Sequence, residues 1–248
     1  MSQVKSSKER NKELVKAVLA GDFDSARRWV EQGANVNARS FSQGVDSPRS
    51  TLLHALCLAN PLGGDTPFDV DRVSAAQFLL EHGADVNALD ENGDTPLHLV
   101  CNPDIALTKL LIGHGADVNL TGGDGETVLY RHCRAGSIGS IRTILKADLS
   151  PDTLKGALTF VLNAPVKTIN HAKVVLELLE RLAIAPDGEF DGKPILDYFN
   201  DHGAAAYNAI GEAQRLHRSV QMWDSLSSAM GKEHDPSDSG AHSPSFSL

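Results

Sequence analysis

Two histidine–cysteine pairs are the residues whose types and spacing most readily suggest chemistry. His54 and Cys57, and again His98 and Cys101, lie three residues apart, which places both side chains of a pair on one face of a helix. Imidazole nitrogen and thiolate sulfur bind zinc, but a structural zinc site needs four converging ligands. A third segment of similar sequence carries Tyr130 at the histidine position. We therefore expect the histidines to hydrogen-bond to neighbouring backbone groups, and we predict no metal or other cofactor.

The cysteines and a glycine-rich segment are equally poor catalytic motifs. Cys57, Cys101 and Cys133 each follow a threonine by six residues, so they are expected at equivalent points of stacked helices. Neighbouring helices lie about 8–10 Å apart, too far for a disulfide, so we predict buried, reduced thiols. The Gly-Gly-Asp-Gly segment at 122–125 lacks the strand, lysine and spacing of a phosphate-binding loop and predicts a turn. We predict that the protein is not an enzyme.

The composition favours a helical protein. The chain has 248 residues, of which 41% are hydrophobic and only 5% aromatic, and its formal net charge is −9. Scarce aromatic residues suit the packing of small-residue helices better than a β-sandwich. The acidic balance argues against a nucleic acid or an anionic membrane as partner and is compatible with a basic protein surface. The polar N-terminus, the lack of an apolar run of about 18 residues and the odd cysteine count together predict a cytoplasmic location.

A short sequence recurs along the chain and organises it. Its fullest copy runs from Gly83-Ala-Asp-Val-Asn87 through a polar turn to Thr95-Pro96-Leu97-His98. Related copies begin at Gly33 and at Gly115. Threonine can cap a helix and proline suits its first turn, while a glycine with positive φ can reverse the chain after a helix. Each copy therefore predicts a polar turn that leads into two short antiparallel helices, a unit that can bury its apolar face only by stacking.

This pattern resembles the ankyrin repeat. The resemblance implies an all-α solenoid of five to six repeats, clear over residues 11–148 and degenerate over 149–230, where a C-terminal cap is also expected. We predict a flexible N-terminus at 1–10, a first helix from about Asn11 to Ala20, a last helix at roughly 203–230, and a disordered tail at 231–248. Segment 191–196 is interpreted as a degraded copy of 92–97, and an insert rich in proline and glycine interrupts the second repeat at 60–69.

The family resemblance implies a protein-binding function. We expect a monomeric module that binds another protein, and neither nucleic acid nor membrane, on the concave face formed by finger loops and inner helices. The loop that leads into the second repeat is lengthened, with 14 positions from Asn37 to Thr51 against 8 from Asn87 to Thr95. Replacing Phe41 and Asp90 with alanine is expected to weaken partner capture without loss of stability. The predicted partner-binding residues are Arg39, Phe41, Arg49, Leu89, Asp90, Glu91, Thr121, Asp124, Glu126, Tyr130, Arg131 and Arg134.

Narrower functions and a different domain organisation remain open at this point. An inhibitor or immunity-type regulator of one enzyme or toxin fits the small size and acidity, as does a translocated bacterial effector. The C-terminal Phe246-Ser247-Leu248 could be recognised as a peptide with a free carboxylate. Residues 150–230 could also form a small separate domain with an activity of its own.

Overall fold

The computed structural model describes residues 5–39, 50–58, 71–100, 104–163, 169–199 and 204–229. The chain divides into two compact units, Met1–Pro165 and Val166–Leu248. The helices of the first unit are α1 (Ser7–Leu19), α2 (Phe23–Glu31), α3 (Leu52–Cys57), α4 (Arg72–Glu81), α5 (Pro96–Leu99), α6 (Ile105–Gly113), α7 (Val128–Ala135), α8 (Ile138–Ile144) and α9 (Pro151–Asn163). The elements of the second unit are α10 (Ile169–Arg181), strands β1 (Glu189–Phe190) and β2 (Lys193–Pro194), the 3₁₀ helix η1 (Ile195–Tyr198) and α11 (Ala204–Ala229).

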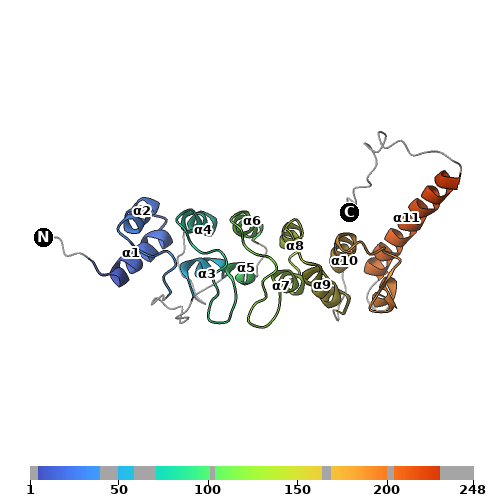
Figure 1. Cartoon of the computed structure of the whole chain (residues 1–248), viewed down its shortest axis with the longest axis horizontal. Helices are drawn as coiled ribbons and strands as arrows, with labels where there is room; N and C mark the ends of the chain where they lie inside the picture. The colour runs from blue at the N-terminus through green and yellow to red at the C-terminus, as the bar shows by residue number, and fades with distance from the viewer. Residues whose placement is uncertain are drawn as a thin grey trace. The chain divides into compact units, whose positions relative to one another are not determined.

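The first unit is a stack of helix pairs. Figure 1 shows α2, α4, α6 and α8 in one row and α1, α3, α5, α7 and α9 in the other. Within the first row α4 contacts α6 and α6 contacts α8, while in the second row α3, α5, α7 and α9 contact one another in sequence. The residues buried between the rows are mainly small and aliphatic, among them Leu53, Leu97 and Leu129 at the same point of three successive repeats. The predicted all-α solenoid is confirmed.

Asparagine side chains fasten each repeat to the next. The side-chain amide of Asn87 donates to the Gly115 carbonyl at 3.1 Å, and its oxygen accepts from the Asp117 N–H at 2.8 Å. The same two bonds join Asn37 to residues 83 and 85, and Asn119 to residues 148 and 150. Because Asn119 meets residues 148 and 150 as Asn87 meets 115 and 117, a fifth repeat begins at 148 although its sequence has lost the motif.

This fifth repeat has no finger loop. Ser150, which bonds to Asn119, is also the residue whose hydroxyl accepts from the Thr153 N–H at 3.1 Å at the start of α9. In the third and fourth repeats, eight positions separate the asparagine that joins the repeats (Asn87 or Asn119) from the threonine before the next helix (Thr95 or Thr127). These positions form the finger loop. Helix α9 therefore follows the turn at once and packs on α7 as the next helix of its row.

The N-terminal helix begins earlier than the sequence predicted. Helix α1 starts at Ser7, four residues before Asn11, within the segment expected to be flexible. The Ser6 hydroxyl accepts from the Glu9 N–H at 3.3 Å, and the Glu9 carboxylate accepts from the Ser6 N–H at 2.8 Å. This reciprocal capping satisfies two amides that a helix end otherwise leaves unpaired. The cap therefore extends the helix into the segment that was expected from the sequence to be flexible.

The second unit keeps part of the predicted repeat pattern. Asp191 and Gly192 have positive φ angles of 50° and 73° and form the turn between β1 and β2. The segment predicted as a degraded copy of 92–97 therefore preserves a turn, but the short η1 follows it in place of an inner α-helix. Helix α11 packs on α10 and η1 and agrees with the predicted last helix to within one residue at each end. The predicted insert at 60–69 and tail at 231–248 lie outside the described residues.

Candidate protein-binding surface

Two finger loops, residues 88–94 and 120–126, are closed by their own polar groups. One carboxylate oxygen of Asp90 accepts from the N–H groups of Asn92 and Asp94, at 2.8 and 2.9 Å. In the next loop the Gly122 N–H donates to the Glu126 carbonyl at 2.8 Å. Asp90 is therefore part of the turn, and replacing it with alanine will cost stability, contrary to the expectation from the sequence.

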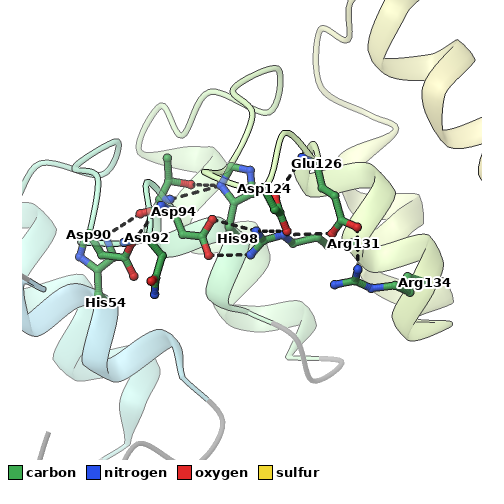
Figure 2. A network of polar contacts seen from close by, with 10 residues as sticks. His54, Asp90, Asn92, Asp94, His98, Asp124, Glu126, Arg131 and Arg134 are labelled. Atoms are coloured by element: carbon green, nitrogen blue, oxygen red, sulfur yellow. Dashed lines mark hydrogen bonds and ion pairs between the residues drawn. The ribbon is translucent and has the colours of Figure 1, made fainter. Parts of the chain in front are cut away.

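Arg131 on α7 joins the two loops. Its guanidinium donates to both carboxylate oxygens of Asp94, at 2.7 and 2.8 Å, and lies 2.7 Å from Asp124. Figure 2 shows the planar group held between the loop before α5 and the loop before α7. Only 12% of the Arg131 side chain is exposed. A residue predicted to contact a partner is thus occupied within the chain, where it holds neighbouring fingers at a constant spacing.

The charges of this network are nearly balanced. The hydrogen bond from Arg131, followed by one from the Glu126 N–H, lowers the pKa of Asp124 to about 2. Burial acts to lower the pKa of Arg131, but its hydrogen bonds to Asp94 and Asp124 outweigh burial and raise it. Arg134 pairs with Glu126 at 2.6 Å. The network pairs three carboxylates with two guanidinium groups, and Asp90 and Glu91 of the first loop add further formal negative charge to this surface.

Two glycines allow the loops to touch. A Cβ atom on Gly123 would collide with the backbone carbonyl oxygen of Asn92, and one on Gly122 would collide with the carboxylate of Asp94. The Gly-Gly-Asp-Gly segment is therefore needed for close packing between fingers, in agreement with its interpretation as a turn. Because Asn92 contributes a backbone atom, the contact at Gly123 cannot be relieved by a change of rotamer.

Replacing Gly123 with alanine is expected to lower the free energy of unfolding by about 1–2 kcal/mol, because the added methyl group forces the loops apart. Urea denaturation followed by circular dichroism measures this effect. Gly156→Ala is the matched control: no atom lies within 4 Å of its added Cβ, and the site is inside helix α9. This control should gain up to about 1 kcal/mol from helix propensity. Equal effects of the two changes would contradict the close approach of the loops.

The repeat histidines serve the backbone, as predicted. His54 Nδ1 accepts from the Thr51 N–H at 3.3 Å, and its Nε2 lies 3.0 Å from the Ala88 carbonyl oxygen and 3.1 Å from that of Asp94. These partners require a neutral ring that carries its proton on Nε2. Burial lowers the pKa of His54 accordingly. His98 Nδ1 accepts in the same way from the Thr95 N–H at 3.3 Å.

The described cysteines are buried thiols. Cys57 and Cys133 are free, and burial raises the pKa of both, that of Cys133 to about 12. Cys101 lies outside the described residues. Within the described ranges no three His, Cys, Asp or Glu side chains gather as a metal site would require. In the same part of the chain, none of the helices combines the length and apolar character of a membrane span.

The predicted site residues fall into distinct groups. Asp90, Asp124, Glu126 and Arg131 make the hydrogen bonds and ion pairs that shape the two loops. Phe41 and Arg49 lie outside the described residues. The exposed residues among those predicted are Arg39, Leu89, Glu91, Thr121, Asp124 and Arg134. The structure therefore brings the loop residues together, and the exposed Leu89, Glu91, Thr121 and Arg134 lie beside them.

The sequence prediction missed Phe160. Its ring lies on α9, half-buried, with its centroid 4.5 Å from that of Tyr130 on α7. No finger loop lies between α8 and α9. The aromatic pair therefore joins α7 and α9, which are neighbours in the row of α1, α3, α5, α7 and α9. Phe160 would have been found only if α9 had been identified as the inner helix of a fifth repeat, and the Asp148–Ser150 segment carries no motif to show this.

Helix pairs stacked through an asparagine ladder, with finger loops between them, define a repeat solenoid. A family model described as "Ankyrin repeats (3 copies)" matches residues 5–121 and 68–155, which together cover more than half of the 248 residues. The chain belongs to the ankyrin-repeat family. It is also 40% identical over 70 residues to a protein of Caenorhabditis elegans named "Ankyrin repeat and LEM domain-containing protein 1 homolog". That match spans 28% of this chain and 9% of the relative.

Proposed function

We propose that this protein is a non-enzymatic module that binds another protein through its finger loops and inner helices. Ankyrin repeats are generally protein–protein interaction modules. The proposed surface consists of loops 88–94 and 120–126 together with the Tyr130–Phe160 pair and Arg134. The observation that carries the proposal is that Arg131 holds both loops in one arrangement while exposed side chains remain beside them.

The locked loops favour tight binding. Ordering a flexible loop costs binding free energy, so a loop that is already fixed leaves more of the contact energy for affinity. In the described part of the chain, Arg131 and the contact at Gly123 fix both loops before any partner arrives. The residues that make the internal contacts would then hold the loops in place, and the exposed residues beside them would contact the partner.

The aromatic pair is the proposed centre of the surface. Tyrosine and arginine are enriched among residues that dominate binding energies, especially where a less important polar rim surrounds them. Tyr130 and Phe160 present two partly exposed rings, and the exposed Arg134 lies one helical turn after Tyr130. The remaining negative charge favours a partner segment that combines an apolar side chain with a basic one.

Replacing Tyr130 and Phe160 together with alanine is expected to weaken binding at least about tenfold, because partly buried aromatic residues dominate such interfaces. The partner is first isolated with the full chain and identified by mass spectrometry, and its affinity is then measured by calorimetry. Ile105→Ala, an exposed position on α6 in the other row, is the control and should leave the affinity unchanged. If the double variant bound normally and Ile105→Ala weakened binding, the partner would lie on the opposite row of helices.

A further inference from the structure

Helix α11 extends past the elements that support it. It has 26 residues, whereas α10 has 13. Ile210 and Ala213 are buried, and Gln214 donates to the Pro186 carbonyl at 2.9 Å. Further along the helix, His217 and Arg218 lie 3.7 Å from Asp187, in the turn before β1. Residues 218–222 are exposed on every side of the helix.

Large apolar side chains gather on this extension. Leu216, Val220 and Met222 are 51%, 52% and 63% exposed. Among the described residues, only Leu89 and Ile105 are other large hydrophobic side chains with comparable exposure. Single exposed hydrophobic residues are ordinary, but two on one face of a helix form an apolar surface that favours burial, whereas Met222 lies on another side of the helix. Leu216 and Val220 are one turn apart and share a face.

The extension also carries a charge opposite to that of the chain. Residues 215–222 include Arg215, His217 and Arg218 and contain no aspartate or glutamate. The segment is therefore positive, although the whole chain has a formal net charge of −9. A helix with exposed aliphatic and basic side chains is suited to an apolar groove with acidic edges, since the groove buries the first kind of side chain and its edges pair with the second.

We propose that residues 215–222 of α11 dock as a helix into an apolar groove of a partner protein whose rim carries carboxylates. A second copy of the chain is a poorer occupant, because paired α11 helices would bring their arginines close together. An anionic membrane is also a poorer occupant, because the strongly negative chain is repelled by it. The surface is independent of the finger loops, so the two proposals can fail separately.

Calcium-loaded calmodulin serves as the probe, because it is acidic and its methionine-rich groove accepts many basic amphipathic helices. The full-length protein is titrated into it by calorimetry, with EDTA present in a parallel experiment to close the groove. We expect binding that requires calcium and falls at least tenfold when Leu216 and Val220 are both replaced by aspartate. Ser219→Asp with Gln221→Asp introduces the same charge without removing apolar surface and should reduce binding less.

Further measurements separate the proposal from its competitors. Replacing Arg215 and Arg218 with glutamine should weaken binding and reduce its salt dependence, and Tyr130→Ala with Phe160→Ala should leave calmodulin binding unchanged. No calcium-dependent binding at about 100 µM protein, which corresponds to a negligible affinity, would overturn the proposal. Sedimentation with phosphatidylserine-containing vesicles, or a dimer that Leu216→Asp with Val220→Asp dissociates, would overturn it in favour of a membrane or a second copy.

Discussion

Replacing Arg131 with methionine is expected to lower the free energy of unfolding by about 3 kcal/mol, as is usual when one partner of a buried ion pair is removed. Methionine keeps much of the side-chain volume but leaves Asp94, which is almost fully buried, without its two charge-assisted hydrogen bonds. Asp124 and Glu126 would then repel Asp94 across the two loops. Urea denaturation at neutral pH measures the loss.

Arg134→Met is the matched control for this prediction. Arg134 lies on the same helix and pairs with Glu126 at 2.6 Å, but its side chain is mostly exposed. Solvent screens such a pair, so the control should lose less than about 1 kcal/mol. Adding Asp94→Asn to Arg131→Met removes the uncompensated charge and should recover part of the lost stability. If both arginine variants were equally stable, the proposed locking of the finger loops would be wrong.

The Arg131 variant also tests how the surface works. Arg131 itself is largely covered, so it offers little area to a partner. If the locked loops are what favours binding, Arg131→Met should weaken partner capture under conditions in which the variant is still folded. A loss of stability with unchanged affinity would show that the loops need no internal support for binding, and the exposed residues alone would account for the interaction.

The stacked helices were predictable from local sequence. Glycines that end helices, threonines that precede them and leucines at a constant position recur in the same order in successive repeats, although the second repeat is longer, and each has a local physical role. The positive φ angles of Gly83 and Gly115, 85° and 86°, agree with the predicted chain reversals. The fifth repeat was harder to define because its register depends on the bonds from Asn119 to residues 148 and 150, which join parts of the chain about 30 residues apart.

The candidate site was less predictable, because exposure depends on side-chain partners. The sequence placed Asp90, Asp124 and Arg131 near the finger loops. It did not show that Arg131 pairs with Asp124, or that Asp90 accepts hydrogen bonds from the backbone of its own turn. A charged residue looks equally available for binding whether it faces solvent or a neighbouring carboxylate. Phe160 was missed for the opposite reason: its helix follows a turn without the repeat motif, so nothing local marks the residue as a neighbour of Tyr130.

His132 should make the protein sensitive to mild acid. It lies on α7, is 1% exposed, and its Nε2 has no hydrogen-bond partner among the described residues. Burial, followed by the nearby His98, lowers the pKa of His132 from 6.5 to about 4. The folded protein therefore holds the ring neutral under conditions in which the unfolded chain would bind a proton.

The sign of the pH effect follows from this difference. Above pH 6.5 neither state protonates His132, so its contribution to stability is constant. As the pH falls from 6.5 towards 4, the unfolded chain binds the proton and the folded protein does not, so stability decreases. His132 alone should remove about 2 kcal/mol between pH 7.5 and pH 5 and about 3 kcal/mol by pH 4. Burial also lowers the pKa values of His54 and His98, which act in the same direction.

His132→Leu should raise stability by about 1 kcal/mol at pH 7.5, since it removes an unpartnered buried nitrogen, and should flatten the pH dependence. Leu56 and Val100 occupy the equivalent position of the two preceding repeats, five residues after Thr51 and Thr95, so an apolar side chain suits this point of the stack. Urea denaturation at pH 7.5, 6 and 5 measures both effects, and His114→Gln, at an exposed histidine, should change neither. If His132→Leu lost stability on acidification as steeply as the natural sequence, the acid sensitivity would belong to other groups.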